Sequence, residues 1–277
     1  PGDDLTQVCI ARSVPGQEND MFVGSVRLGQ FHAEDRFDAL CPALEIKPYQ
    51  ATHPIGIGEG DGLHAGGPGL ADQFPEKYRK KLFMCNIHQH EVLIDIMERK
   101  GSGYVGRHGA DFLPVNDLAW VGFSVEIGPD GGVYILDWHD TDVCGNAINF
   151  PDSGRVYRIM PKGAKKIERP NLRSLSDLEL VSMQDHSNDW YVRQARVLLH
   201  TRAASGKLNN GPVNEKLNKM FQTASTSGKR LRALWAMNVI GGLNEARMLT
   251  MLNHKDEYIR AWNVQLLCEN KDPSVLA

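Results

Sequence analysis

The sequence predicts a β plus α chain of two domains, a partial β-propeller-like sheet domain over residues 1–169 and a HEAT-type helical solenoid over residues 170–277. Three observations support this fold class. Glycine and proline are concentrated before Pro170. Apolar residues alternate in several segments of that part, and from Leu175 onward they recur with the helical period of about 3.6. Net charge also changes sign, from −7 over residues 1–170 to +4 over residues 171–277.

Composition excludes several functional classes. Of the 277 residues, 42% are apolar and 23% are charged, so the chain can bury a core. Its net charge of −3 argues against a nucleic-acid partner. No run of apolar residues is long enough to predict a transmembrane helix. The five cysteines include no C-x-x-C pair, so we expect neither a zinc ribbon nor a haem attachment site. Because the chain begins at Pro1 without a methionine or a signal peptide, we expect its ends to have been cut, either by processing or because the sequence is part of a larger gene product.

The sheet domain is predicted from alternating segments and one strong turn. The predicted strands are Leu82–His88, Glu91–Met97, Phe123–Ile127, Val133–Trp138 and Ser153–Met160. Gly128-Pro-Asp-Gly-Gly132 is a turn signal between two of them. This spacing is typical of a propeller blade of about 40–45 residues. So short a domain supplies at most about four blades, so we expect no closed ring. Residues 1–75 or another chain should cover the free strand edges.

The helical domain is predicted from three segments that align with one another. Each has a short first helix, a turn, and an apolar residue followed by arginine at the start of a second helix. The arginines are Arg193, Arg232 and Arg260, at intervals of 39 and 28 residues. Such helix pairs are typical of HEAT arrays. We expect the arginines to brace turns between repeats; the alternative is that they form a ligand cluster.

Three stretches of the sequence resemble a family of large bacterial proteins, abundant in planctomycetes and acidobacteria and described as putative membrane-bound dehydrogenases. The stretches are Pro75–His90, Glu98–His108, and Gly128–Trp138 together with Ser153–Ile159. The family joins a sugar-dehydrogenase-like β-propeller to helical repeats, and many members add a cytochrome module. The resemblance covers residues 75–277 and implies a sugar-like substrate, an extracytoplasmic location and, in some members, calcium and pyrroloquinoline quinone (PQQ). This chain lacks the haem module, and its sheet region is short, so PQQ chemistry is poorly supported.

A cluster of carboxylates follows the strand that ends at Trp138. Asp137, Asp140 and Asp142 lie within six residues, and His139 lies among them. Hard oxygen ligands so spaced in a loop suit Ca²⁺, and we expect these four residues to hold that ion. The alternative is a solvated turn in which aspartates cap their own backbone.

Four further residues are candidates for acid–base chemistry. In an extended strand His88 and His90 would share one face. Arg107 and His108 end a glycine-rich loop, where the arginine would orient a substrate and a histidine would move a proton. The alternatives are histidines bonded to backbone carbonyls and an arginine that pins its loop. No G-x-S-x-G elbow occurs, and no serine or cysteine has a histidine at a recognisable spacing, so we do not expect a serine or cysteine hydrolase.

These expectations combine into a propeller-type enzyme acting on a small sugar- or lactone-like substrate by calcium-assisted, lactonase-like hydrolysis. One alternative is a non-catalytic scaffold that binds a protein partner, or a second copy of itself, through the HEAT surface and exposed strand edges. Another is a fragment of a PQQ-type sugar dehydrogenase.

Overall fold

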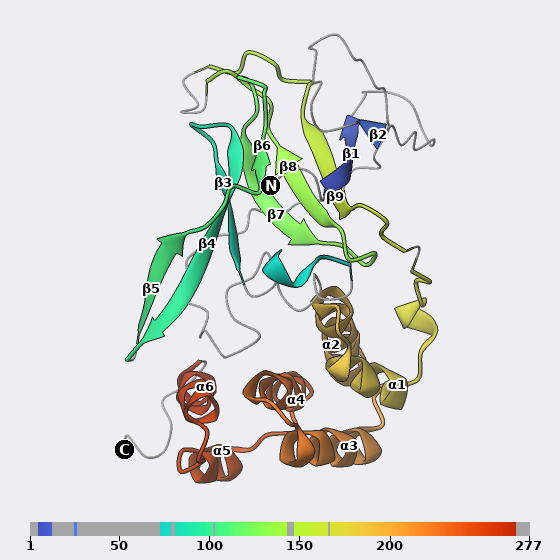
Figure 1. The fold of residues 1–277 in the computed structure, drawn as a ribbon. Coiled ribbons are helices and arrows are strands. Elements are labelled where there is room, and N and C mark those ends of the chain that lie inside the picture. Colours follow the sequence, from blue (N-terminus) through green and yellow to red (C-terminus); the bar gives the residue numbers. More distant parts are fainter. Residues whose placement is uncertain are drawn as a thin grey trace. The chain divides into compact units, whose positions relative to one another are not determined.

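A computed structural model of the chain describes residues 5–12, 25–26, 73–78, 81–101, 103–142, 147–165 and 167–269. Two compact units are present, a sheet unit that ends at Ile167 and a helical unit that begins at Glu168 (Figure 1). Among the described residues, no helix is both long and apolar enough to cross a membrane.

The strands of the sheet unit form two antiparallel sheets. The first has the order β2-β1-β9-β8-β7, and the second has the order β3-β4-β5 with β6 paired to β4 (Figure 1). The strands are β1 (Leu5–Arg12), β2 (Ser25–Val26), β3 (Leu82–Asn86), β4 (Glu91–Lys100), β5 (Gly103–His108), β6 (Leu113–Pro114), β7 (Gly122–Ile127), β8 (Val133–Asp137) and β9 (Arg155–Pro161). A short 3-10 helix, Glu76–Tyr78, precedes β3. The predicted strands Leu82–His88 and Glu91–Met97 are present as β3 and β4, which pair as an antiparallel hairpin.

The turn between β7 and β8 is also confirmed. Gly131 has a φ of 73°, a conformation that favours glycine. The Asp130 carboxylate accepts hydrogen bonds from the Gly132 amide, the Tyr134 hydroxyl and Arg158 of β9. One side chain therefore joins the turn, β8 and β9.

The free edge of β9 is covered by β1, with Val8 opposite Ile159 in an antiparallel register. The expectation that an N-terminal segment covers a strand edge is thus confirmed for β1. Most of residues 1–75 lie outside the described residues.

The two sheets share one hydrophobic core. Trp120 and Val92 are completely buried in it, and Phe83 meets Phe112 edge-on at 4.9 Å between ring centroids. Because side chains from β3, β4, β7, β8 and β9 all enter this core, the two sheets stabilise each other.

The described residues of the helical unit form six α-helices around a second core. They are α1 (Asp177–Ser182), α2 (Asp189–Ala204), α3 (Asn210–Thr223), α4 (Ser227–Val239), α5 (Glu245–Met251) and α6 (Glu257–Cys268). The sequence marks their starts well, because side chains of the residues before α1, α2, α4, α5 and α6 accept N-capping hydrogen bonds. Ser176 and Glu179 form a capping box at the start of α1.

The fold class predicted from the sequence is wrong. The described strands form two small antiparallel sheets, and neither closes on itself. The meander of β7, β8 and β9 has blade-like spacing, but spacing along the chain does not determine how sheets assemble. The helices do not establish a HEAT solenoid, since α1 has six residues, α5 seven and α2 sixteen.

The three aligned arginines also occupy different environments. Arg193 is half exposed and forms an ion pair within its own helix. Arg232 is buried and donates to the carbonyl of His186 in the preceding helix pair. Arg260 donates to the carbonyl of His254, just before its own helix. The alignment therefore detected helix starts and not one repeated contact.

Candidate active site

A buried ion pair lies where β8 ends and β9 begins. Asp137 and Arg155 are opposite each other in the register of these strands. Nε and Nη2 of Arg155 are both 2.6 Å from Oδ2 of Asp137, and Nη1 is 2.6 Å from Oδ2 of Asp117. Oδ1 of Asp137 accepts the backbone N–H groups of Val121 and His139. One guanidinium thus joins two carboxylates from separate segments, and both oxygens of Asp137 have partners.

Asp140 and Asp142 cap the loop that follows. Oδ1 of Asp140 accepts the Asp142 amide, and Oδ2 accepts the amides of Asn149 and Phe150. These hydrogen bonds, led by that of Asp142, lower the pKa of Asp140 to about 2. Oδ2 of Asp142 accepts the Ala147 amide. Asp140 and Asp142 thus cap nearby backbone N–H groups, as in the alternative to a calcium site.

These carboxylates do not fit a calcium site. Calcium needs six to eight oxygen ligands, but here N–H donors and a guanidinium already point at the oxygens of Asp137 and Asp140. Within the described ranges, no group of three or more His, Cys, Asp or Glu side chains is placed to hold a metal ion.

His139 lies between a serine and a carboxylate. Its Nδ1 is 2.7 Å from Oγ of Ser153, and its Nε2 is 3.7 Å from Oδ2 of Asp117. The imidazole stacks on Phe150 at 5.6 Å between centroids. The φ of His139 is 53°, a left-handed conformation that a non-glycine residue adopts at a cost of about 1–2 kcal/mol. The strained backbone is thus combined with a specifically held imidazole, a pattern that is common in functional sites.

The carboxylate beside His139 is ionised. Burial raises the pKa of Asp117, but the Ala119 amide and the charge of Arg155 lower it more, so the pKa lies below its ordinary value. A negative charge at this position stabilises a positively charged imidazole. We refer to Asp117, Asp137, His139, Ser153 and Arg155 as the strand-end site.

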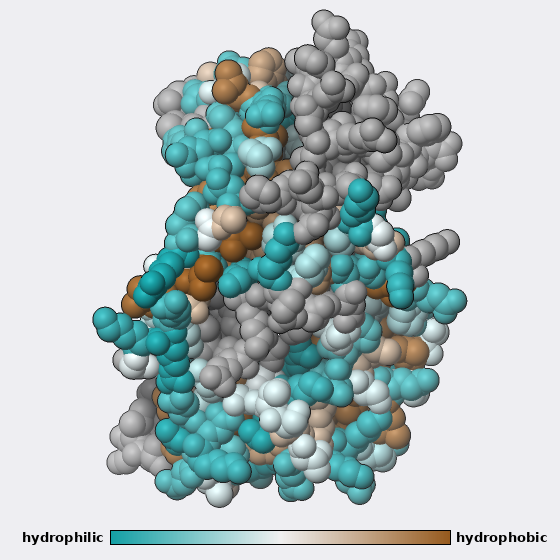
Figure 2. All heavy atoms as spheres, viewed as in Figure 1, coloured by the Kyte–Doolittle hydropathy of each residue, from teal (hydrophilic) through white to brown (hydrophobic). Residues whose placement is uncertain are grey.

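Exposed apolar side chains come from the same loops. Leu118, Trp138, Ile148 and Phe150 are all exposed. The loops are held together because the Trp138 amide donates to the Val121 carbonyl and the Asn149 amide donates to Asp140. Figure 2 shows hydrophobic side chains among hydrophilic ones at the end of the sheet unit that is uppermost in the view. Such a patch beside a polar network is typical of a ligand-binding surface.

His88 and His90 lie in the turn between β3 and β4. The prediction that they share one face of a strand is wrong, because this turn interrupts the strand and His90 has a φ of 54°. Nδ1 of His90 is 2.8 Å from the carbonyl oxygen of Trp120, the residue before Val121. His88 is exposed. The structure therefore brings His90, but not His88, to a segment that contacts Asp137.

Arg107 and His108 lie on β5 and not in a loop. Arg107 is mostly exposed and pairs with Glu98 at 3.1 Å. His108 lies 3.3 Å from Asp95 and 3.3 Å from Asp111, and the hydrogen bond with Asp95 chiefly raises its pKa. Asp95 is five residues after His90, or about 17 Å along an extended strand. His108 thus belongs to a surface cluster with Asp95 and Asp111.

Cys85 on β3 is close enough to Asp137 to sense its charge. Burial, together with that charge, raises the pKa of the Cys85 thiol to about 12. At neutral pH it is a protonated thiol, which is a poor nucleophile.

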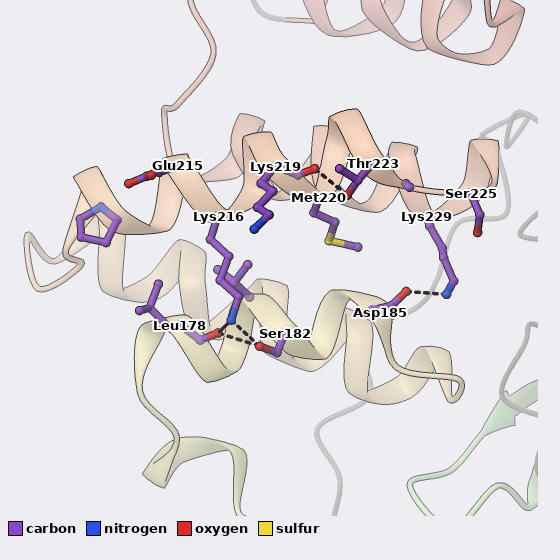
Figure 3. Close-up of a pocket in the computed structure, with 13 residues that line it drawn as sticks. Leu178, Ser182, Asp185, Glu215, Lys216, Lys219, Met220, Thr223, Ser225 and Lys229 are labelled. Atoms are coloured by element: carbon purple, nitrogen blue, oxygen red, sulfur yellow. Dashed lines mark hydrogen bonds and ion pairs between the residues drawn. The ribbon is translucent and has the colours of Figure 1, made fainter.

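The helical unit carries a groove between α1 and α3, with a volume of about 820 Å³. Nζ of Lys216 donates to the Leu178 carbonyl and the Ser182 hydroxyl, and Lys229 pairs with Asp185 at 2.6 Å (Figure 3). Figure 3 shows the amine of Lys219 directed into the groove. Lys219 makes no side-chain ion pair or hydrogen bond with the part of the chain that the structure describes. The groove therefore offers one cation to a ligand.

Sequence reasoning missed Asp117, Ser153 and Arg155. Ser153 is fourteen residues from His139, and Asp117 is twenty-two residues before it, so no local spacing links them. Only the pairing of β8 with β9 brings Ser153 back to His139. A weak signal was present, since Ser153-Gly-Arg155 opens the predicted strand.

Comparison with known proteins adds one finding. A family described only as a domain of unknown function (DUF7133) matches residues 69–165. The match spans β3 to β9 and none of the helices α1 to α6. No curated protein and no solved structure matches the chain.

Proposed function

We propose that the strand-end site hydrolyses a small sugar- or lactone-like ester, with Ser153 as nucleophile and His139 as base. The distance of 2.7 Å between Oγ of Ser153 and Nδ1 of His139 carries this proposal. Nucleophile and base within hydrogen-bond reach, with a third group beside the base, are the signature of an activated serine.

The reaction proceeds by acyl transfer. Oγ of Ser153 attacks the carbonyl carbon while its proton moves to Nδ1 of His139. The bond from the carbonyl carbon to the leaving oxygen breaks, and that oxygen takes the proton from His139. A water molecule then gives a proton to His139 and attacks the acyl carbon, and Ser153 recovers its proton as the acid leaves. Asp117 stabilises the protonated imidazole.

The surrounding residues supply binding and positioning. Trp138 and Phe150 are exposed beside the site, and aromatic faces contact the apolar side of a sugar ring or lactone. Arg155 holds Asp117 at 2.6 Å and acts as a positioning residue.

A structural role for Ser153 makes a competing prediction. Its Oγ is also 2.9 Å from the Phe150 carbonyl and 3.2 Å from the His139 carbonyl, contacts that a loop-bracing serine would make. A fluorophosphonate probe and a panel of lactones and p-nitrophenyl esters separate the two roles. We expect Ser153→Ala and His139→Asn to lower turnover by about 10²–10⁴. Ser124→Ala, a change at another partly exposed serine of the sheet unit, is the matched control.

The proposal fails if the purified chain has no activity above buffer on the panel. It also fails if Ser153→Ala retains wild-type turnover, or if the fluorophosphonate probe labels Ser153→Ala and the wild type equally. Because no metal takes part in the proposed reaction, EDTA should leave the activity unchanged.

The groove of the helical unit favours a second candidate function, binding of an acidic partner segment. Leu178 is exposed along it, and Lys219 offers a cation beside that apolar surface. Fluorescence anisotropy with a labelled Glu/Leu-rich peptide tests this function. Lys219→Glu should weaken binding, whereas Lys207→Glu, a change at an exposed lysine outside the groove, should not. Equal binding by both variants would exclude the groove.

A further inference from the structure

Three arginines gather around one carboxylate where α2 packs on α4. Arg193 donates from Nε to Asp189 at 2.9 Å, and Nη2 of Arg232 is 3.3 Å from the same carboxylate. Arg196 lies one turn after Arg193 on α2 and is partly exposed. Among the described residues, Asp189 is thus a carboxylate that Arg193 and Arg232 share, with Arg196 close by on the same helix.

Arg196 has a buried donor that lacks an acceptor. Its Nε is buried and has no hydrogen-bond partner among the described residues. The guanidinium lies over the ring of Trp235, 5.0 Å from the ring centre. Nε1 of Trp235 is also buried without an acceptor in the described part of the chain. Two neighbouring N–H donors thus lack the acceptor that buried polar groups normally have.

The electrostatics of Arg196 agree with this geometry. The pKa of Arg196 is lowered to about 10, chiefly by burial; the charge of Asp189 opposes this shift, and the charges of Arg232 and Arg193 add to it. A buried cation without a full counter-charge destabilises the fold. A negatively charged ligand would remove that penalty.

We propose that Arg193, Arg196 and Arg232, beside Trp235, form a binding site for an oxyanion, the carboxylate or phosphate group of a ligand. Guanidinium groups bind both groups through paired hydrogen bonds. The indole of Trp235 supplies a flat apolar surface next to the charge, which suits a ligand with an apolar or aromatic part. This site is in the helical unit and does not depend on hydrolysis at the strand-end site.

The test uses the full chain with inorganic phosphate and, separately, succinate as probes. Thermal midpoints of the helical transition are measured at constant ionic strength, with sodium chloride replacing the probe. We expect the midpoint to rise with the logarithm of probe concentration, because a ligand that binds only the folded state stabilises it. The larger of the two responses identifies phosphate or carboxylate as the preferred group. Tryptophan fluorescence should change in parallel, and Trp235→Phe should remove that change.

Variants of Arg196 make the test specific. Arg196→Met should raise the midpoint without any probe and abolish the probe-dependent rise, since it removes the uncompensated charge. Arg196→Lys should bind the probe several-fold more weakly, because lysine lacks the planar fork. Lys207→Met should respond like the wild type. The proposal is overturned if neither probe exceeds sodium chloride, or if Arg196→Met responds as the wild type does. If Arg196→Met does not fold, a wild-type response by Arg196→Lys overturns it.

Discussion

The ion pair between Asp137 and Arg155 makes a sharp prediction about stability. The side chain of Asp137 is completely buried and that of Arg155 is 6% exposed. Asp137→Asn retains an Oδ1 that accepts the Val121 and His139 amides, so the change acts mainly on the oxygen that faces Arg155. Breaking a buried ion pair by changing one partner costs about 3–5 kcal/mol.

A loss of 1 kcal/mol lowers the melting temperature of a domain of this size by about 2–4 °C. The loss of the ion pair should therefore lower the melting temperature of the sheet unit by roughly 6–20 °C. Differential scanning calorimetry of the full chain measures this shift. Asp142→Asn is the control, because Asp142 lies in the same loop, is only partly buried and accepts the backbone N–H of Ala147. We expect the control to lose less than about 1 kcal/mol.

A double-mutant cycle with Arg155→Met tests the reasoning itself. Once Arg155 is replaced by an apolar side chain, Asp137→Asn should cost far less than it does alone, giving a coupling energy of about 2 kcal/mol or more. The reasoning is refuted if Asp137→Asn alone costs under about 1 kcal/mol, or if the two changes add within about 0.5 kcal/mol. Such a result would mean that the Asp137 carboxylate does not depend on Arg155 and could bind a metal ion.

Three other outcomes follow from the structure. The lowered pKa of Asp140 means that its stabilising hydrogen bonds are complete above the unfolded pKa of about 4 and are lost as pH falls toward 2; Asp140→Asn should flatten the acid limb of a melting-temperature profile. The raised pKa of His108 means that its pairing with Asp95 stabilises fully below about pH 6.5 and is lost as pH rises through the folded value; His108→Asn should remove this dependence in the same assay. Gly122→Ala forces a Cβ against the buried Trp120 ring and should lower the free energy of unfolding in urea by about 1–3 kcal/mol. Gly211→Ala, in open space on α3, should raise it by about 0.5–1 kcal/mol. Equal effects of the two changes would contradict the close contact of Gly122 with Trp120.

The strand-end site shows the limit of motif reasoning. The sequence shows Asp137, Asp140 and Asp142 as a cluster of carboxylates at the end of a predicted strand. It did not reveal that Arg155 neutralises Asp137, because that contact depends on the register of β8 against β9. A carboxylate cluster looks the same in sequence whether its oxygens face a metal ion or backbone N–H groups.

The sequence by itself determined the local elements of this protein. Alternation predicted β3, β4, β7, β8 and β9 but not β5, Gly128–Gly132 predicted the turn between β7 and β8, and the apolar period from Leu175 onward predicted helices. These features depend on neighbours a few residues apart, whose geometry the backbone dictates. How the strands divide into two sheets, which histidine meets Ser153, and why Nε of Arg196 lacks an acceptor among the described residues depend on the tertiary structure. Those outcomes depend on contacts between distant residues, which compete through burial and pairing and leave no fixed spacing in the chain.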